Sequence, residues 1–248
     1  FTVDGKTGTS EKTIEVISVS EDLIYYIDSG VGNWNSNLSK SAYYELVGKK
    51  ADLRNALPDQ IYTEGSWGIV NPEDSSKEGY ANAGNRTSSE NSIYANGWWA
   101  KDGKVCEYII PLENGTYEAA GYFAEWWSAS RPIKFYVQYT DDSGKAVKSE
   151  ETVITLSGSD AKQTAKAAFT VAGVADKAEV HFYAENAEGK AAPAPVIAGL
   201  AVEWKGTADE KAQLEADKAA AKASLENVAV SPAGDSAAEM YVGDTQDM

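Results

Sequence analysis

The stretch VCEYIIPLENGTYEAAGYFA, from Val105 to Ala124, decides the fold class. Two runs rich in β-branched and aromatic residues flank Asn114-Gly115 within it. An Asn-Gly pair between such runs is a strong signal for a tight turn that joins antiparallel strands. The stretch therefore predicts a β-hairpin in the middle of the chain.

Strand-like runs separated by turn residues continue on both sides of this stretch. They are Leu23 to Asp28, Pro132 to Tyr139, Thr152 to Leu156, Ala167 to Val171, Ala178 to Ala184 and Val196 to Trp204. Many short strands without amphipathic helices between them are typical of an antiparallel sandwich. We therefore expect an all-β sandwich of the jelly-roll type. The polar region from Trp34 to Gly97 predicts long ordered loops, with room for a short helix between Ser41 and Asn55.

Changes in composition along the chain suggest where the sandwich begins and ends. We expect it to occupy residues 22–205, preceded in residues 1–21 by the end of another module or by a first strand of its own. Residues 206–227 are mostly good helix formers with few apolar positions, which predicts a solvated helical spacer. Residues 228–248 look like the opening strands of a further module, so we expect the chain to be a piece of a longer protein.

The overall composition excludes several classes of function. The 248 residues include 22 basic and 38 acidic side chains, for a net charge of −16, and so acidic a surface repels nucleic acid and anionic lipid. No stretch approaches the roughly 18 apolar residues that a membrane-spanning helix needs. With one cysteine and one histidine, the chain has no disulfide framework, multi-cysteine metal site or histidine cluster.

No pattern of residues predicts catalysis. His181 stands in the middle of a strand-like run, Cys106 lacks a neighbouring base, and there is no Gly-x-Ser-x-Gly motif or phosphate-binding loop. Glycoside hydrolysis needs two carboxylates that face each other across a cleft, and no spacing in this acidic chain singles out such a pair. We expect a protein that is not an enzyme.

Two pairs of adjacent tryptophans are the most informative feature for function. Neighbouring residues in a strand point to opposite faces, so one indole of each pair can enter the core while the other faces solvent or a groove. An exposed indole can stack on the less polar face of a sugar ring while nearby polar groups bind the hydroxyls. The candidate binding residues are therefore Trp126, Trp127, Trp98, Trp99 and Arg131, followed by Tyr80, Asn85 and Arg86. Alternatively, the indoles fill the ends of the sandwich beneath the loops.

Several segments resemble known carbohydrate-binding modules. The stretches from Tyr108 to Glu118 and from Gly121 to Trp126 are similar to galactose-binding-like and malectin-like modules, as is the closing run from Ala198 to Trp204. The stretch from Leu23 to Gly30, together with Leu57 to Tyr62, resembles accessory modules of large secreted bacterial glycoside hydrolases. After the spacer, the Val-Gly-Asp-Thr run that ends at residue 245 resembles a turn of bacterial immunoglobulin-like repeats.

The resemblance implies a non-catalytic module that binds a neutral oligo- or polysaccharide and targets a covalently linked glycoside hydrolase to it. It also implies an extracellular or cell-wall location. Such families often carry a structural calcium, but no Asp-rich loop in this sequence marks its ligands. The alternative is a structural or adhesive spacer of a Gram-positive cell-surface protein, in which all the indoles are buried.

Overall fold

The computed structural model describes residues 2–3, 6–7, 18–31, 40–70, 80–82, 92–100 and 104–206. The chain divides into two units, Phe1–Ala208 and Asp209–Met248, and every described residue belongs to the first. The predicted spacer helix and the predicted strands after it lie outside the described residues. Among those that are described, no helix is long and apolar enough to cross a membrane.

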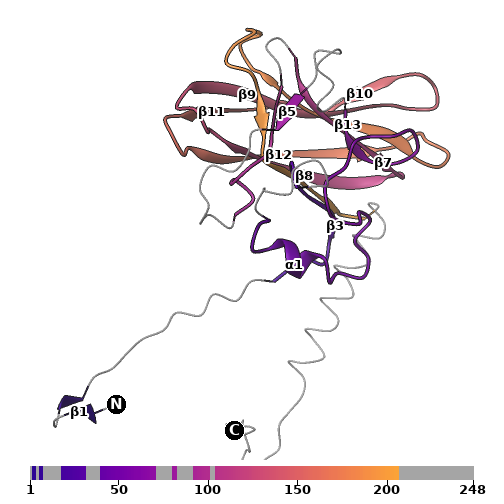
Figure 1. Ribbon diagram of the computed structural model, residues 1–248. Helices are drawn as coiled ribbons and strands as arrows, with labels where there is room; N and C mark the ends of the chain where they lie inside the picture. Colours follow the sequence, from indigo (N-terminus) through magenta and orange to yellow (C-terminus); the bar gives the residue numbers. More distant parts are fainter. Residues whose placement is uncertain are drawn as a thin grey trace, which may run out of the picture. The chain divides into compact units, whose positions relative to one another are not determined.

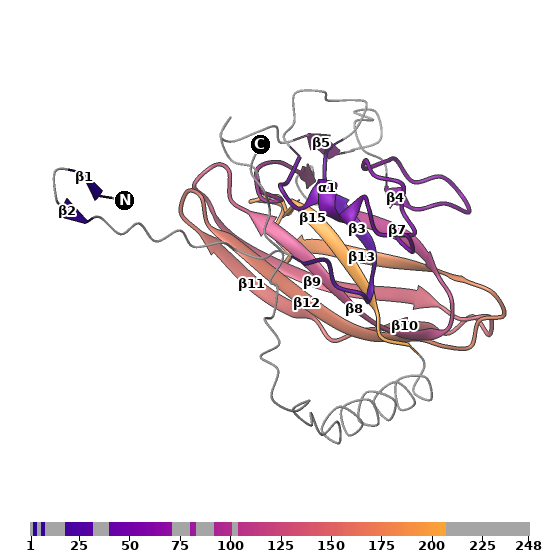
Figure 2. The same ribbon diagram turned by 90° about the horizontal axis from the view of Figure 1, so that it is seen from below.

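The described part is an antiparallel β-sandwich, which confirms the predicted fold class (Figures 1 and 2). One sheet has four strands in the order β12 (Lys162–Val171), β8 (Gly115–Ala124), β15 (Gly199–Trp204) and β3 (Leu23–Asp28). The other has six strands: β10 (Ala146–Lys148), β9 (Ser130–Thr140), β13 (Ala178–Asn186), β7 (Cys106–Leu112) and β4 (Gly68–Ile69), with β11 (Thr152–Ser157) also paired to β9.

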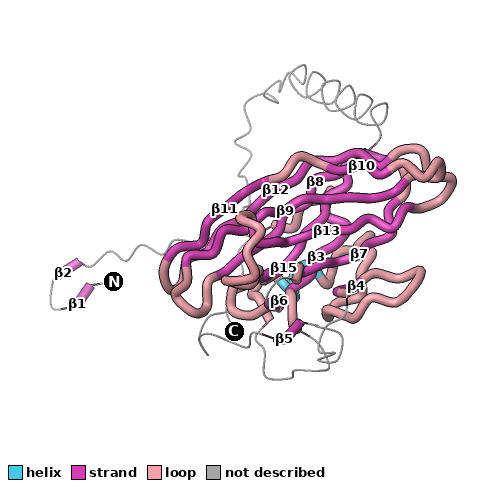
Figure 3. Tube along the Cα trace, turned by 90° about the horizontal axis from the view of Figure 1, so that it is seen from above, coloured by secondary structure: helices cyan, strands magenta, loops and turns pink. Residues whose placement is uncertain are grey.

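Smaller elements complete the fold, and Figure 3 shows how far strands and loops outweigh helix in it. A three-stranded sheet has the order β14 (Val196–Ile197), β6 (Trp98–Ala100) and β5 (Tyr80–Asn82). The strands β1 (Thr2–Val3) and β2 (Lys6–Thr7) pair with each other. The short helix expected between Ser41 and Asn55 is α1 (Tyr44–Val47).

The hairpin predicted at Asn114-Gly115 is wrong. β7 pairs with β13 and β4, whereas β8 pairs with β12 and β15, so the turn carries the chain from one sheet to the other. The side chain of Asn114 shows why the two strands diverge: it donates to the carbonyl of Val174 at 2.7 Å and accepts the amide of that residue at 3.3 Å. Asn114 thus joins this connection to the one between β12 and β13, which also passes between the sheets.

Aromatic side chains fill the space between the sheets. Phe123 of β8 meets Phe135 of β9 edge to face at 5.8 Å, and Phe169 of β12 meets Phe182 of β13 at the same distance. Residues of β8 alternate between buried and half-buried, so every second side chain of the four-stranded sheet is left on its outer face.

Buried polar contacts hold the long loops in place. The carboxylate of Asp59 accepts hydrogen bonds from the amide of Gly30, the indole of Trp98 and the hydroxyl of Tyr108, each at 2.8 Å. Asn55 bonds both the amide and the carbonyl of Tyr26, at 3.1 and 2.8 Å. The described parts of the region between residues 34 and 97 are thus ordered, as the sequence predicts.

Candidate functional site

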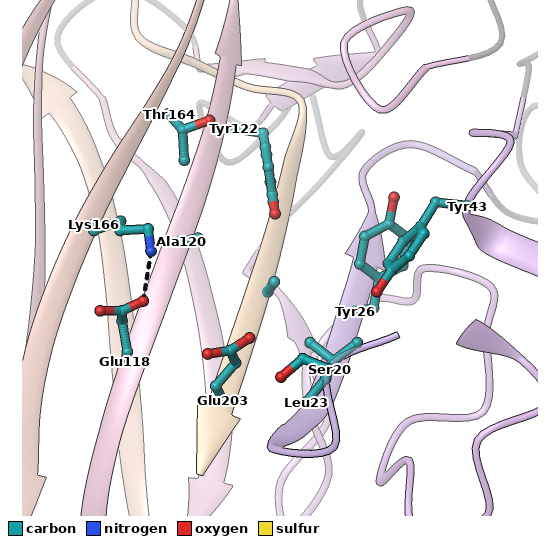
Figure 4. Close-up of a pocket in the computed structure, with 11 residues that line it drawn as sticks. Ser20, Leu23, Tyr26, Tyr43, Glu118, Ala120, Tyr122, Thr164, Lys166 and Glu203 are labelled. Atoms are coloured by element: carbon teal, nitrogen blue, oxygen red, sulfur yellow. Dashed lines mark hydrogen bonds and ion pairs between the residues drawn. The ribbon is translucent and has the colours of Figure 1, made fainter. Parts of the chain in front are cut away.

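The outer face of the four-stranded sheet has a groove because the strand register places two alanines side by side. Ala120 of β8 lies opposite Ala201 of β15, and Ala201 in turn lies opposite Tyr26 of β3. Methyl side chains at the centre of a sheet leave space that larger residues would fill. The result is a groove of about 340 Å³ on this face (Figure 4).

Two half-buried tyrosines stand on either side of β15 at this groove (Figure 4). Tyr122 projects from β8, and its ring packs edge to face on Tyr94 at 5.9 Å. Tyr43 immediately precedes α1 and packs in the same way on Tyr26, at 5.3 Å. Each exposed ring is therefore held in position by a second ring behind it.

Charged and hydroxyl groups line the rest of the groove. Glu118 of β8 lies opposite Glu203 of β15, and Lys166 of β12 donates to Glu118 at 2.7 Å (Figure 4). The hydroxyl of Thr164 bonds that of Tyr94 at 2.9 Å. A carboxylate has about four acceptor positions, so those of Glu118 and Glu203 can accept further hydrogen bonds from a ligand.

Burial raises the pKa of Tyr122 to about 12 and holds that of Tyr26 well above its ordinary value. Both phenols are therefore neutral near pH 7 and keep their O–H groups. The groove thus combines aromatic rings, neutral hydroxyls and carboxylates around an apolar floor. This is the set of groups that suits a ligand with one apolar face and many hydroxyls.

The two glutamates are not arranged for hydrolysis. They lie side by side on adjacent strands of one sheet face, and each already accepts a hydrogen bond from an ammonium group, Glu118 from Lys166 and Glu203 from Lys205. A glycosidase needs its two carboxylates to face each other with the scissile bond between them. The geometry therefore favours binding over catalysis.

The tryptophans predicted from the sequence lie elsewhere, near the end of β8. Trp98 and Trp126 are buried, with indole N–H groups that donate to Asp59 at 2.8 Å and to the carbonyl of Tyr94 at 3.0 Å. Trp99 is half-buried and Trp127 is 50% exposed. Each pair thus has one core indole and one at the surface, although Trp126 and Trp127 lie beyond the strand.

Trp99, Trp127 and Arg131 border a hollow of about 300 Å³, together with Pro193 and Ala194. We call this the indole hollow. The two indoles meet edge to face at 6.2 Å, and the guanidinium of Arg131 lies 5.6 Å from the centre of the Trp127 ring.

The remaining predicted residues are not placed: Asn85, Arg86 and the side chain of Tyr80 lie outside the described residues. Sequence reasoning in turn missed the groove. Its signal is the outward alternation of Glu118, Ala120 and Tyr122, which any solvent-facing strand can show. The pairing of Ala120 with Ala201, which makes the floor, joins residues 81 positions apart in sequence and leaves no local trace.

The calcium that the resemblance implies finds no fitting site in the part of the chain that the structure describes. No group of three or more His, Cys, Asp or Glu side chains gathers there. Asp59, which is buried, already accepts from four donors, since the amide of Gln60 also bonds it at 2.8 Å. A carboxylate surrounded by N–H and O–H groups in this way does not serve as a cation ligand.

Comparison with known proteins finds distant similarity to solved structures alone. No family model matches the sequence, and no curated protein matches it. Among solved structures, the CBM22-1 xylan-binding domain of Paenibacillus barcinonensis Xyn10C is 13% identical with a TM-score of 0.40, over 59% of this chain and 90% of that domain. TmCBM61, solved with β-1,4-galactotriose, is 11% identical with a TM-score of 0.31, over 56% of this chain and 85% of its own.

A β-glucuronidase of Bacteroides uniformis is also similar, at 15% identity and a TM-score of 0.38, over 64% of this chain. The matching region spans 16% of that enzyme's length. Identities and TM-scores this low leave the function to be argued from the groove itself.

Proposed function

We propose that the protein is a non-catalytic carbohydrate-binding module that holds a neutral oligo- or polysaccharide in the groove of the four-stranded sheet. The observation that carries this proposal is the juxtaposition of Tyr122 and Tyr43 across a floor of Ala120 and Ala201. The C–H face of a pyranose ring stacks on a tyrosine ring, and the alanines leave room for the sugar to approach the sheet.

The polar groups of the groove favour a neutral ligand. Sugar hydroxyls donate to the carboxylates of Glu118 and Glu203 and accept from Lys166. Lys166 is already paired with Glu118, and Lys205 with Glu203, so an anionic glycan would compete with these carboxylates for the ammonium groups, on a chain whose net charge is −16. Neutral sugars avoid this repulsion.

In its biological setting, the module acts outside the cell and brings a linked glycoside hydrolase to its polysaccharide, which raises the local substrate concentration. The resemblance of the sequence to accessory modules of secreted enzymes supports this part of the proposal. The rival function is a structural spacer of a cell-surface protein, in which every indole is buried. The 50% exposure of Trp127 favours the binding function.

The proposal is tested by filling the groove without removing any contact of the fold. Ala120→Leu places a larger side chain on the groove floor, and Ala146→Leu makes the same change at an exposed position of β10, which belongs to the other sheet. We expect calorimetry with soluble xylan, β-1,4-galactotriose and other neutral glycans to show binding by the intact protein. Ala120→Leu should weaken it by about tenfold or more, which is about 1.4 kcal/mol, and Ala146→Leu should leave it unchanged. Equal affinities for all three proteins would exclude the groove as the binding site.

A further inference from the structure

Sugar binding in the groove does not explain the exposed tryptophan of the indole hollow, which lies apart from the groove. The ring of Trp127 stands edge to face on Trp126 at 5.7 Å and on Trp99 at 6.2 Å, yet half of its surface remains exposed. Leaving half of so large an apolar side chain in water forgoes stabilisation that burial would give. An aromatic ring that only filled the end of the sandwich would be covered.

The backbone around Trp127 is fixed in an uncommon conformation. The amide of Trp127 donates to Glu125 at 2.7 Å, and the next residue, Ser128, has a φ of +67° without being a glycine. Non-glycine residues in the left-handed region cost energy and cluster at active sites and ligand-binding sites. Here such a residue directly follows Trp127, at the edge of the hollow.

The charges of the hollow are already balanced inside the protein. Arg131 donates through Nε to Glu125 at 2.8 Å, and another of its N–H groups bonds the carbonyl of Ala194. Because the fully buried carboxylate of Glu125 neutralises this guanidinium, an anionic ligand would gain little. A third N–H group of Arg131 donates to Glu125 at 3.3 Å, so two of its five remain for hydroxyl oxygens, on a side chain that borders the hollow with 5% of its surface exposed. Indole faces beside a guanidinium whose charge is already balanced by Glu125 suit a neutral sugar ring.

We propose that the indole hollow is a second sugar-binding site, separate from the groove, so that one sandwich binds a neutral glycan at two points. The ligand class rests on the proposed function, whereas the site rests on the geometry of Trp99, Trp127 and Arg131. The groove and the hollow share no lining residue. Two sites on one module strengthen attachment to a polymer that offers many binding units, without any new contact.

The aromatic composition of the two sites allows them to be observed separately. The groove is lined by tyrosines and the hollow by two tryptophans. A sugar in the hollow therefore changes tryptophan emission under selective excitation, whereas a sugar in the groove does not touch an indole. Soluble xylan, β-1,4-galactotriose and other neutral oligosaccharides serve as probes. Calorimetry counts the sites, and thermal unfolding shows that each variant is folded.

Three variants decide between the outcomes: Ala120→Leu in the groove, Trp127→Ala in the hollow, and Trp127→Phe, which keeps an aromatic ring. We expect two sites in the intact protein and one in each of the first two variants. The change in tryptophan emission should persist in Ala120→Leu and disappear in Trp127→Ala, and the second site should return in calorimetry in Trp127→Phe. Retention on insoluble xylan should fall further for the double variant than for either single one.

The contrary results separate this inference from the proposed function. If Ala120→Leu abolishes all binding and Trp127→Ala changes neither the number of sites nor the affinity, the hollow is not a site although the groove is. If Trp127→Ala alone abolishes binding, the hollow is the site and the groove is not. If no neutral probe changes tryptophan emission or releases heat, both proposals fail.

Discussion

Glu125 and Arg131 form an ion pair in which both side chains are almost completely withdrawn from water, with relative side-chain exposures of 0% and 5%. Nε of Arg131 lies 2.8 Å from Oε2 of Glu125, and the other carboxylate oxygen accepts the amide of Trp127 at 2.7 Å. Since Arg131 also bonds the carbonyl of Ala194, the pair joins the turn after β8 to the segment before β14. These two segments form the wall of the indole hollow.

Removing one partner of this pair should cost far more than removing both. Glu125→Gln or Arg131→Met leaves a buried charge without its counter-charge, and we expect either to lower the free energy of unfolding by about 3–5 kcal/mol. The double variant buries no charge, so its loss should be clearly smaller than the sum of the two single losses. Urea unfolding of all four proteins measures the coupling. Additive losses would show that the pair does not act as a unit.

Asp28 should make the protein less stable at neutral pH than at mildly acidic pH. Burial raises its pKa from 3.8 to about 6, so the folded protein binds this proton more tightly than the unfolded chain does. The resulting stabilisation is complete below about pH 4 and is lost as the pH rises through about 6. Asp28→Asn removes the cost of the buried charge, and we expect it to stabilise the fold by roughly 1–3 kcal/mol at pH 8 and little at pH 4.

Chemical unfolding at several pH values checks this, with the exposed Glu150→Gln as the control. Asp28→Asn can keep the acceptor that the amide of Ser41 now reaches at 2.6 Å. A stability gain that does not depend on pH would contradict the assignment to Asp28.

Asp59→Asn should destabilise the protein, in contrast to Asp28→Asn, although burial also raises the pKa of Asp59 to about 6. Its oxygens accept from four donors, among them the indole of Trp98 and the hydroxyl of Tyr108. In Asp59→Asn, an amide NH₂ replaces one of these oxygens and faces a donor. We expect a loss of about 1–3 kcal/mol at pH 8, measured by the same unfolding experiment. A gain like that of Asp28→Asn would mean that the charge outweighs the hydrogen bonds.

The sequence predicts the strands better than their partners, for a physical reason. Leu23–Asp28 is a strand with the predicted bounds, because a dense run of β-branched and aromatic residues is a local property of the sequence. Whether β7 pairs with β8 depends on contacts such as that of Asn114 with Val174, 60 residues away. The same limit applies to function: the tryptophan pairs could be read as one buried and one exposed indole each, but the groove floor depends on the register of β8 against β15.

Gly97 should be one of the positions where a single methyl group disrupts the fold. A Cβ atom there would lie 2.2 Å from the carbonyl oxygen of Ile197 and 2.7 Å from Cα of Ala198, both of which are backbone atoms that cannot rotate away. Gly97→Ala must therefore push β6 from β14 and displace Trp98 from its hydrogen bond with Asp59. We expect a loss of about 3 kcal/mol or more in the free energy of unfolding.

Gly48→Ala is the matched control, because it adds the same methyl group where the chain has room for it. Gly48 follows α1 with a φ of −60°, and the nearest atom to a Cβ there would be the end of Leu57 at 3.4 Å. Alanine restricts the unfolded chain more than glycine does, so this variant should be unchanged or more stable by about 0.4–1 kcal/mol. Urea unfolding compares the two proteins with the intact chain.

Because a Cβ at Gly97 would also lie 2.9 Å from the Trp126 ring, Gly97→Ala should alter tryptophan emission as well, whereas Gly48→Ala should not. Equal stability of the two variants would mean that β6 can shift without cost, so that the close approach of Gly97 to Ile197 would not be what holds Trp98 and Trp126 in place.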